Sequence, residues 1–141
     1  MYRKTEALCV FLLGGTVYTL IEMLWRGYSH PTMTLAGGVC MLIVHVVNHL
    51  LGSRGGAVGF IAKCTVSAFY ITFVEFIAGV ILNLWLGLGV WDYSSMPGNI
   101  LGQICPAYAA AWFAVSAAAL KLSDLIDLFF NFLKKREKTA V

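Results

Sequence analysis

Two glutamates lie inside long apolar stretches of this chain, and they are the first candidates for chemistry. Glu75 falls near the middle of the run 64–90, and Glu22 falls near the end of the run 8–25. A carboxylate at the centre of a membrane-spanning helix costs roughly 2.5–3.5 kcal/mol, so it normally faces a partner or a water-filled cavity. Glu75 is therefore predicted to serve a function or an interface, or else to hydrogen-bond as a protonated acid in the bundle core.

Glu22 has a simpler alternative, because Arg26 follows it one helical turn later and the two can form an i,i+4 ion pair. Further polar residues gather toward the same end of the apolar runs. Asn99 and Gln103 are expected on one face of a helix, either to bind a polar solute or to hold a turn. The candidate substrate-binding residues are Glu22, Glu75, Asn83, Asn99, Gln103, Tyr93, Asp92 and Arg26.

A second polar group lies near the end of the run 33–51, where His45 and His49 are spaced to share one helix face. Two such histidines can hold a metal ion. No cysteine or carboxylate stands at helical spacing beside them, so packing and hydrogen bonding remain the alternative. The sequence predicts no cofactor, and its four cysteines suit small apolar residues kept reduced.

Composition defines the class of protein that must position these residues. Of 141 residues, 60% are hydrophobic and 12% are charged, with a mean hydropathy of +0.80. Soluble domains carry about 25% charged residues, so this is predicted to be an integral membrane protein. The net charge of +3 sits mostly in the C-terminal tail and suits anionic lipid, with no nucleic-acid partner. No phosphate-binding glycine loop and no catalytic triad order stands out, so no enzyme is predicted. A membrane-embedded enzyme that uses His45, His49 and the carboxylates is the third alternative.

The apolar runs predict an all-α membrane protein with four transmembrane helices. The expected spans are 8–25, 33–51, 64–90 and 100–120, with a linker over 52–63. They form a transmembrane domain over 1–121, and 122–141 is expected to be an amphipathic interfacial helix with a basic tail. The third run is longer than the usual ~20 residues, so it should be tilted or extend past the bilayer.

The four spans are interpreted as two parallel two-helix repeats, 8–51 and 64–120. At an offset of 65 residues, four positions coincide: Tyr28 with Tyr93, Ser29 with Ser94, Gly37 with Gly102, and Cys40 with Cys105. Basic residues divide nine against one between the two predicted sides, with only Arg26 on the outer side. The positive-inside rule then places both termini of a multi-pass membrane protein in the cytoplasm.

One block of residues is similar to a known family. The block begins at Glu22 and Trp25-Arg26-Gly27-Tyr28-Ser29-His30. It continues with Gly37-Gly38, Glu75, Asn83, Trp91-Asp92-Tyr93-Ser94, Pro97, Asn99, Gly102-Gln103-Ile104-Cys105 and Trp112-Phe113. It resembles the small bacterial membrane proteins described as putative ABC-transporter type IV. The resemblance implies a permease subunit in the bacterial inner membrane, with its ATPase as a separate chain.

The function predicted from these observations is a transporter or channel subunit that moves a small polar or cationic solute through a carboxylate-containing cavity. Four spans are few for a complete pathway, so a homodimer or another membrane partner is expected. The alternative is a non-transporting scaffold or accessory subunit, in which the same polar residues fasten a larger complex.

Overall fold

The chain is helical throughout its regular structure. The computed structural model describes residues 2–52 and 56–139, and within these ranges it contains no strand, only a β-bridge between Ile100 and Ile104. The helices are α1 (Tyr2–Arg26), α2 (Pro31–Leu50), α3 (Gly56–Gly79), the π-helix η1 (Val80–Trp85) and α4 (Pro106–Thr139). The all-α expectation is confirmed for the described residues.

Three helices are long and apolar enough to cross a membrane: Lys4–Arg26, Pro31–Leu50 and Gly56–Trp85. Large apolar side chains cover their outer surfaces, and Leu24, Trp25 and Trp85 are each at least 80% exposed. Water would penalise such a surface, whereas lipid tails solvate it. The chain is therefore a membrane protein.

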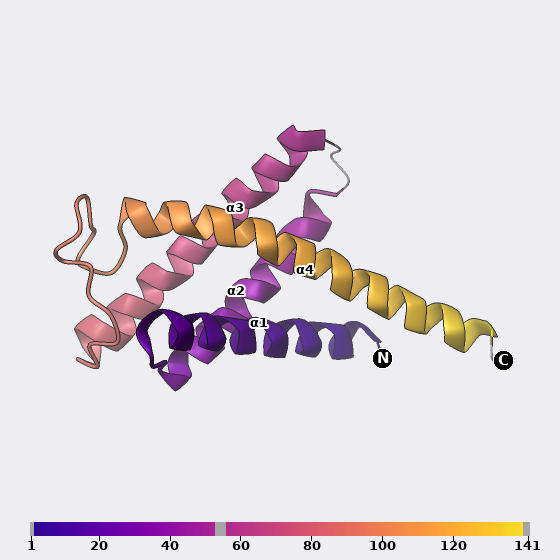
Figure 1. The fold of residues 1–141 in the computed structure, drawn as a ribbon, viewed down its shortest axis with the longest axis horizontal. Coiled ribbons are helices and arrows are strands. Elements are labelled where there is room, and N and C mark those ends of the chain that lie inside the picture. Colours follow the sequence, from indigo (N-terminus) through magenta and orange to yellow (C-terminus); the bar gives the residue numbers. More distant parts are fainter. Residues whose placement is uncertain (1, 53–55, 140–141) are drawn as a thin grey trace.

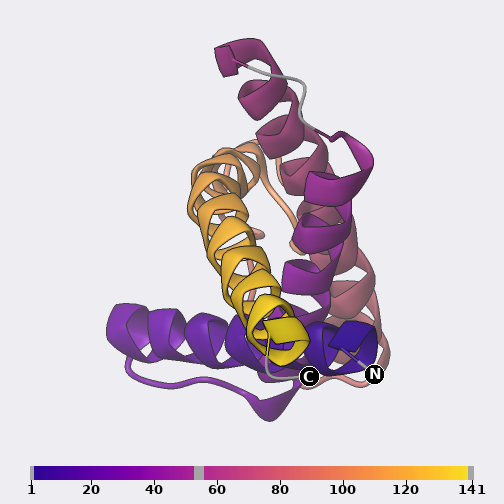
Figure 2. The same cartoon turned by 90° about the vertical axis from the view of Figure 1, so that its right-hand side faces the viewer.

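The helices cross one another rather than forming a parallel bundle (Figure 1). α2 and α3 run side by side in opposite directions, and α4 packs across both (Figures 1 and 2). α4 also runs antiparallel to α1, since Tyr18 stacks on Trp112 near one end and Lys134 Nζ lies 3.4 Å from Glu6 Oε2 near the other. The beginning of α1 and the end of α4 are consequently neighbours.

The turn over 27–30 and the loop over 86–105 lie at the same end of the molecule. We call them the two outer turns, after the side predicted for them, and the second is the outer loop. Arg26, at the end of α1, donates a hydrogen bond of 3.1 Å from Nη1 to the carbonyl oxygen of Val90 in the loop after η1. α1 ends there because Gly27 adopts a φ of +78°, which breaks the helix. The first of these turns therefore packs against the second.

Close helix packing depends on small residues between α1 and α2. A Cβ added at Gly14 would lie 2.2 Å from Met41 Cβ, and one added at Gly37 would lie 2.4 Å from Tyr18 Cβ. Three buried clusters complete the core. They consist of Val10, Met41, Ile126 and Phe130; of Val44, Cys64, Ile71 and Leu120; and of Met33, Val90 and Trp91.

Several predicted boundaries differ from those of the structure. α3 already begins at Gly56, inside the expected linker over 52–63, while Arg54 of that linker lies outside the described residues. α4 begins at Pro106, not at Ile100, because Leu101 and Gly102 have positive φ angles that a helix excludes. Proline then occupies a first helical position, where its missing N–H costs nothing.

α4 also continues past the expected boundary at residue 121. Its sequence from Ala107 to Thr139 contains no glycine or proline, so nothing interrupts the helix. Its buried residues follow one stripe at helical spacing: Ser116, Leu120, Ser123, Ile126 and Phe130. The segment predicted as a separate interfacial helix is thus the second half of α4, and part of its apolar face packs on α1 and α2.

Gly37 and Gly102, which are paired in the proposed repeat, differ in local structure. Gly37 is buried within α2, whereas Gly102 lies in a turn with a φ of +70°. Their likeness in the sequence therefore does not correspond to equivalent places in the fold.

Candidate functional site

Glu75 lies buried on α3 and accepts hydrogen bonds from two other segments. Tyr93 Oη in the outer loop donates to Glu75 Oε1 at 3.0 Å, and Trp112 Nε1 on α4 donates to Oε2 at 2.7 Å. Glu75 is only 8% exposed. Among the residues that the structure describes, no lysine, arginine or histidine forms an ion pair with it.

Aromatic rings surround this carboxylate. Tyr93 stacks on Tyr108 with ring centroids 4.4 Å apart, and Trp112 stacks on Tyr18 with centroids 6.0 Å apart. The four rings come from α1, the outer loop and α4, so they meet only in the folded chain. We call Glu75 with these four rings the aromatic–carboxylate cluster. Only Tyr93 of these rings is among the predicted binding residues. Tyr18, Tyr108 and Trp112 are not, because no helical spacing relates them to Glu75.

Glu22 has the simpler partner that its sequence position indicates. Its carboxylate forms the i,i+4 ion pair with Arg26 and also accepts a hydrogen bond of 2.6 Å from Ser29 Oγ. Arg26 in turn donates to the Val90 carbonyl. Glu22 and Arg26 therefore fasten the end of α1 to both outer turns.

Asn83 and Gln103 bind each other and the outer loop. Asn83 Nδ2 donates to Gln103 Oε1 at 2.8 Å and to the Trp91 carbonyl at 3.0 Å, while Asn83 Oδ1 accepts from the Val90 N–H at 2.7 Å. Trp91 Nε1 donates to the Gln103 carbonyl at 3.0 Å. The two amides thus hold the segment after η1 in place.

Asp92 and Asn99 shape the tip of the same loop. Asp92 Oδ1 accepts from the Ser94 hydroxyl and backbone N–H, and these hydrogen bonds lower the pKa of its carboxyl group. Asn99 Oδ1 accepts from the Gly102 N–H at 2.9 Å. Asn99 and Gln103 lie in a turn before α4, so the prediction that they share a helix face was wrong.

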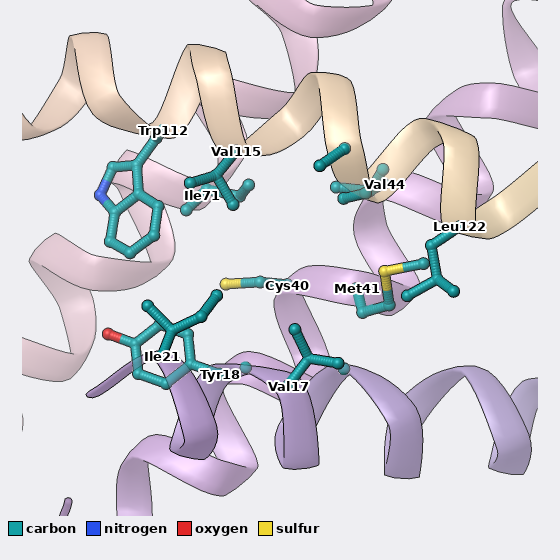
Figure 3. Close-up of a pocket in the computed structure, with 14 residues that line it drawn as sticks. Val17, Tyr18, Ile21, Cys40, Met41, Val44, Ile71, Trp112, Val115 and Leu122 are labelled. Atoms are coloured by element: carbon teal, nitrogen blue, oxygen red, sulfur yellow. The ribbon is translucent and has the colours of Figure 1, made fainter. Parts of the chain in front are cut away.

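A cavity of about 160 Å³ lies beside the cluster, between α1 and α4, with α2 behind it in the view of Figure 3. Its walls are almost wholly apolar, and they include Tyr18, Cys40, Ile71 and Trp112. The rings of Tyr18 and Trp112 occupy one end (Figure 3). None of the eight predicted substrate-binding residues lines it, but Trp112 both forms its wall and donates to Glu75.

The histidines at the other end of α2 acquire a carboxylate that the sequence pattern lacked. His49 Nε2 lies 3.2 Å from Asp127 Oδ1 on α4. His45 Nδ1 lies 2.8 Å from Ser123 Oγ, one turn earlier on α4. The aromatic–carboxylate cluster and the group of His45, His49 and Asp127 therefore lie toward opposite ends of α2 and α3.

Comparison with known families decides the relationship that these residues indicate. The model of the family described as "Putative ABC-transporter type IV" matches residues 31–141. The chain belongs to this family. No curated protein matches the chain, and no solved structure does so.

The matched part of the chain includes α2, α3, η1, the outer loop and α4. Glu75, Tyr93 and Trp112 fall within it, as do His45 and Asp127. Tyr18, Glu22 and Arg26 on α1 lie outside the matched residues. The family match therefore covers most of the aromatic–carboxylate cluster.

Proposed function

We propose that this protein is the membrane subunit of a transport system, and that Glu75 receives a small organic cation. The observation that supports this most directly is a buried carboxylate with aromatic neighbours and no basic partner among the described residues. Tyr93 and Trp112 contact Glu75 through their O–H and N–H groups, so the carboxylate supplies the main attraction for a cation. The two stacked ring pairs add aromatic faces nearby, which also attract cations. This combination favours a cation over an anion or a neutral sugar.

The neighbouring cavity suggests an apolar body for the same solute. Its volume of about 160 Å³ is close to that of an apolar protein cavity of about 150 Å³ that accepts benzene. Trp112 lines this space and also donates a hydrogen bond to Glu75. In the proposed binding step, the apolar group fills the cavity, the indole hydrogen bond breaks, and the cationic group takes its place at Glu75.

We further propose that α4 forms a fourth span and that both termini face the cytoplasm, with the basic residues of 122–141 meeting anionic lipid. From Pro106 to Leu120, α4 extends only about 22 Å, so spanning a ~30 Å hydrocarbon core requires residues beyond Lys121. One chain of this size offers few helices for a pathway. A second copy and a separate ATPase would complete the transporter.

A binding experiment tests this function. Purified wild-type protein should melt at a higher temperature with benzyltrimethylammonium, and benzyl alcohol at the same concentration should have a smaller effect. A ligand at one hundred times its Kd stabilises the folded form by about 2.7 kcal/mol. Glu75→Gln should abolish the difference between the two ligands, whereas Glu137→Gln, at an exposed site of α4, should retain it. Equal shifts in wild type and Glu75→Gln would contradict a role for this carboxylate.

A scaffold or accessory subunit is the second candidate, and the outer loop favours it. Asp92, Asn99, Asn83 and Gln103 all use polar atoms on partners within the chain. Groups that hold a loop rigid suit a fixed docking surface as well as a gate. Absence of any cation-dependent shift, together with stable co-purification of an ATPase or a larger membrane protein encoded beside this gene, would support the scaffold.

A further inference from the structure

Three potential metal ligands converge where α2 meets the second half of α4. One ligand atom each from His45, His49 and Asp127 lie within 4.8 Å of one another. The ring centroids of the two histidines are 4.6 Å apart, and His49 Nε2 is 3.2 Å from Asp127 Oδ1. Asp127 lies on α4, 78 positions beyond His49 in the sequence.

We propose that His45, His49 and Asp127 form a binding site for a divalent transition metal of the Zn²⁺ type, with a fourth position open to water. Zinc bonds of about 2.0–2.1 Å at tetrahedral angles place ligand atoms about 3.3 Å apart. The His49–Asp127 pair already has nearly this separation. The remaining ligand distances are at most 4.8 Å, and metal binding would require side-chain rotations that shorten them toward this value.

Neighbouring residues orient the ligands as metal sites require. A ligating histidine normally hydrogen-bonds through the ring nitrogen that does not bind the metal. Ser123 Oγ lies 2.8 Å from His45 Nδ1, which leaves Nε2 for the metal. Asn48 Nδ2 donates to Ser123 Oγ at 3.2 Å and so holds that hydroxyl. Ser123 is fully buried, and its small side chain lets α4 approach α2 closely.

The charges at this site suit a cation. Asp124 lies one turn before Asp127 and accepts from Asn48 Nδ2 at 2.8 Å. Lys63 is the nearby base on α3, and its ammonium group donates to Asn48 Oδ1 at 2.8 Å instead of to Asp127. Two imidazoles and one carboxylate select nitrogen-binding metals such as Zn²⁺ over Mg²⁺ and Ca²⁺, which prefer oxygen ligands.

The proposed metal ligands are separate from the residues of the aromatic–carboxylate cluster. A metal shared by α2 and α4 would hold the second half of α4 against the end of α2 that carries His45 and His49. It would do so whether or not Glu75 binds a solute, because Tyr93 and Trp112 contact Glu75 near the other end. The inference therefore stands apart from the proposed transport function.

Metal titration of the protein purified without a histidine tag tests the proposal. We expect one Zn²⁺ or Co²⁺ per chain, and Co²⁺ should give visible absorption bands typical of a tetrahedral nitrogen and oxygen site. His49→Gln and Asp127→Asn should each weaken binding by about tenfold or more, the size of effect that even outer-sphere changes produce. His30→Gln, on a histidine at the other end of α2, should leave the affinity unchanged.

Three results would overturn the site. They are the absence of stoichiometric binding, equal affinity in wild type and both ligand variants, and a near-ultraviolet charge-transfer band that assigns Co²⁺ to cysteine. Circular dichroism of each variant separates loss of the ligand from loss of the fold. If His49→Gln does not fold, Asp127→Asn gives the same comparison from the other helix.

Discussion

At the scale of single residues, Glu75 is distinguished by its donors. A buried carboxylate without a basic partner needs hydrogen bonds to offset the loss of water. Tyr93 and Trp112 supply one each, from segments that follow α3 in the chain. The same two bonds connect the outer loop and α4 to α3, so the candidate binding residue also contributes to stability.

Tyr93→Phe should reduce the free energy of unfolding by about 0.6–2 kcal/mol, because Glu75 Oε1 loses its donor while the ring remains. Unfolding in mixed micelles by a denaturing detergent measures this. Tyr70→Phe, at a half-exposed position of α3, is the matched control and should have little effect. Equal losses in the two variants would show that the Tyr93–Glu75 bond contributes nothing to stability.

At the scale of elements, the outer loop is ordered by side chains and not by regular structure. η1 ends at Trp85, and no helix follows until Pro106. Asn83 and Gln103 bind each other from the two ends of this interval, and Arg26 joins it to α1. Amide side chains can replace the missing backbone partners because each carries both a donor and an acceptor. Side-chain hydrogen bonds therefore hold the loop in place.

The α1–α2 pair depends on glycines at its closest approach. Gly37→Ala should reduce the free energy of unfolding by about 1–3 kcal/mol, because the new methyl group would overlap the Cβ of Tyr18. Val39→Leu adds volume on the exposed face of the same helix and should be nearly neutral. Detergent unfolding measures both variants. An unaffected Gly37→Ala would mean that α1 moves away from α2 at little cost.

At the scale of the whole molecule, α4 connects the two ends of the fold. Its first half carries Trp112 to Glu75, and its second half carries Asp127 to the histidines of α2. Its continuous helix fixes these two groups relative to each other. Within the proposed transporter, motion of α4 would therefore displace both Trp112 at Glu75 and Asp127 at the histidines.

Phe130→Ala should reduce the free energy of unfolding by about 3 kcal/mol, since this ring is 4% exposed in the cluster with Val10 and Met41. Phe132→Ala removes an equal side chain from an exposed position of α4 and should cost much less. Detergent unfolding of the two variants makes the comparison. Similar values for both would indicate that the second half of α4 lies free on the membrane surface, as the sequence pattern suggested.

The sequence by itself determined the class of protein and most helices. Hydropathy is a local property, so long apolar runs identify helices whose backbone groups must pair within the segment. α1 ends at Arg26, one residue beyond the expected span 8–25, and the Glu22–Arg26 pair followed from helical spacing. The sequence also selected Glu75 as the carboxylate to explain, because its burial in an apolar run is costly.

Only the tertiary structure decided which residues meet. Trp112 lies 37 positions beyond Glu75, and Asp127 is far in sequence from His49, so no helical period connects either pair. In lipid most helix faces are apolar, and hydropathy therefore does not specify which face packs inward. The start of α4 at Pro106 and its continuation past Lys121 depended on turn geometry and on packing against α1. These contacts, and not the apolar pattern, created both candidate sites.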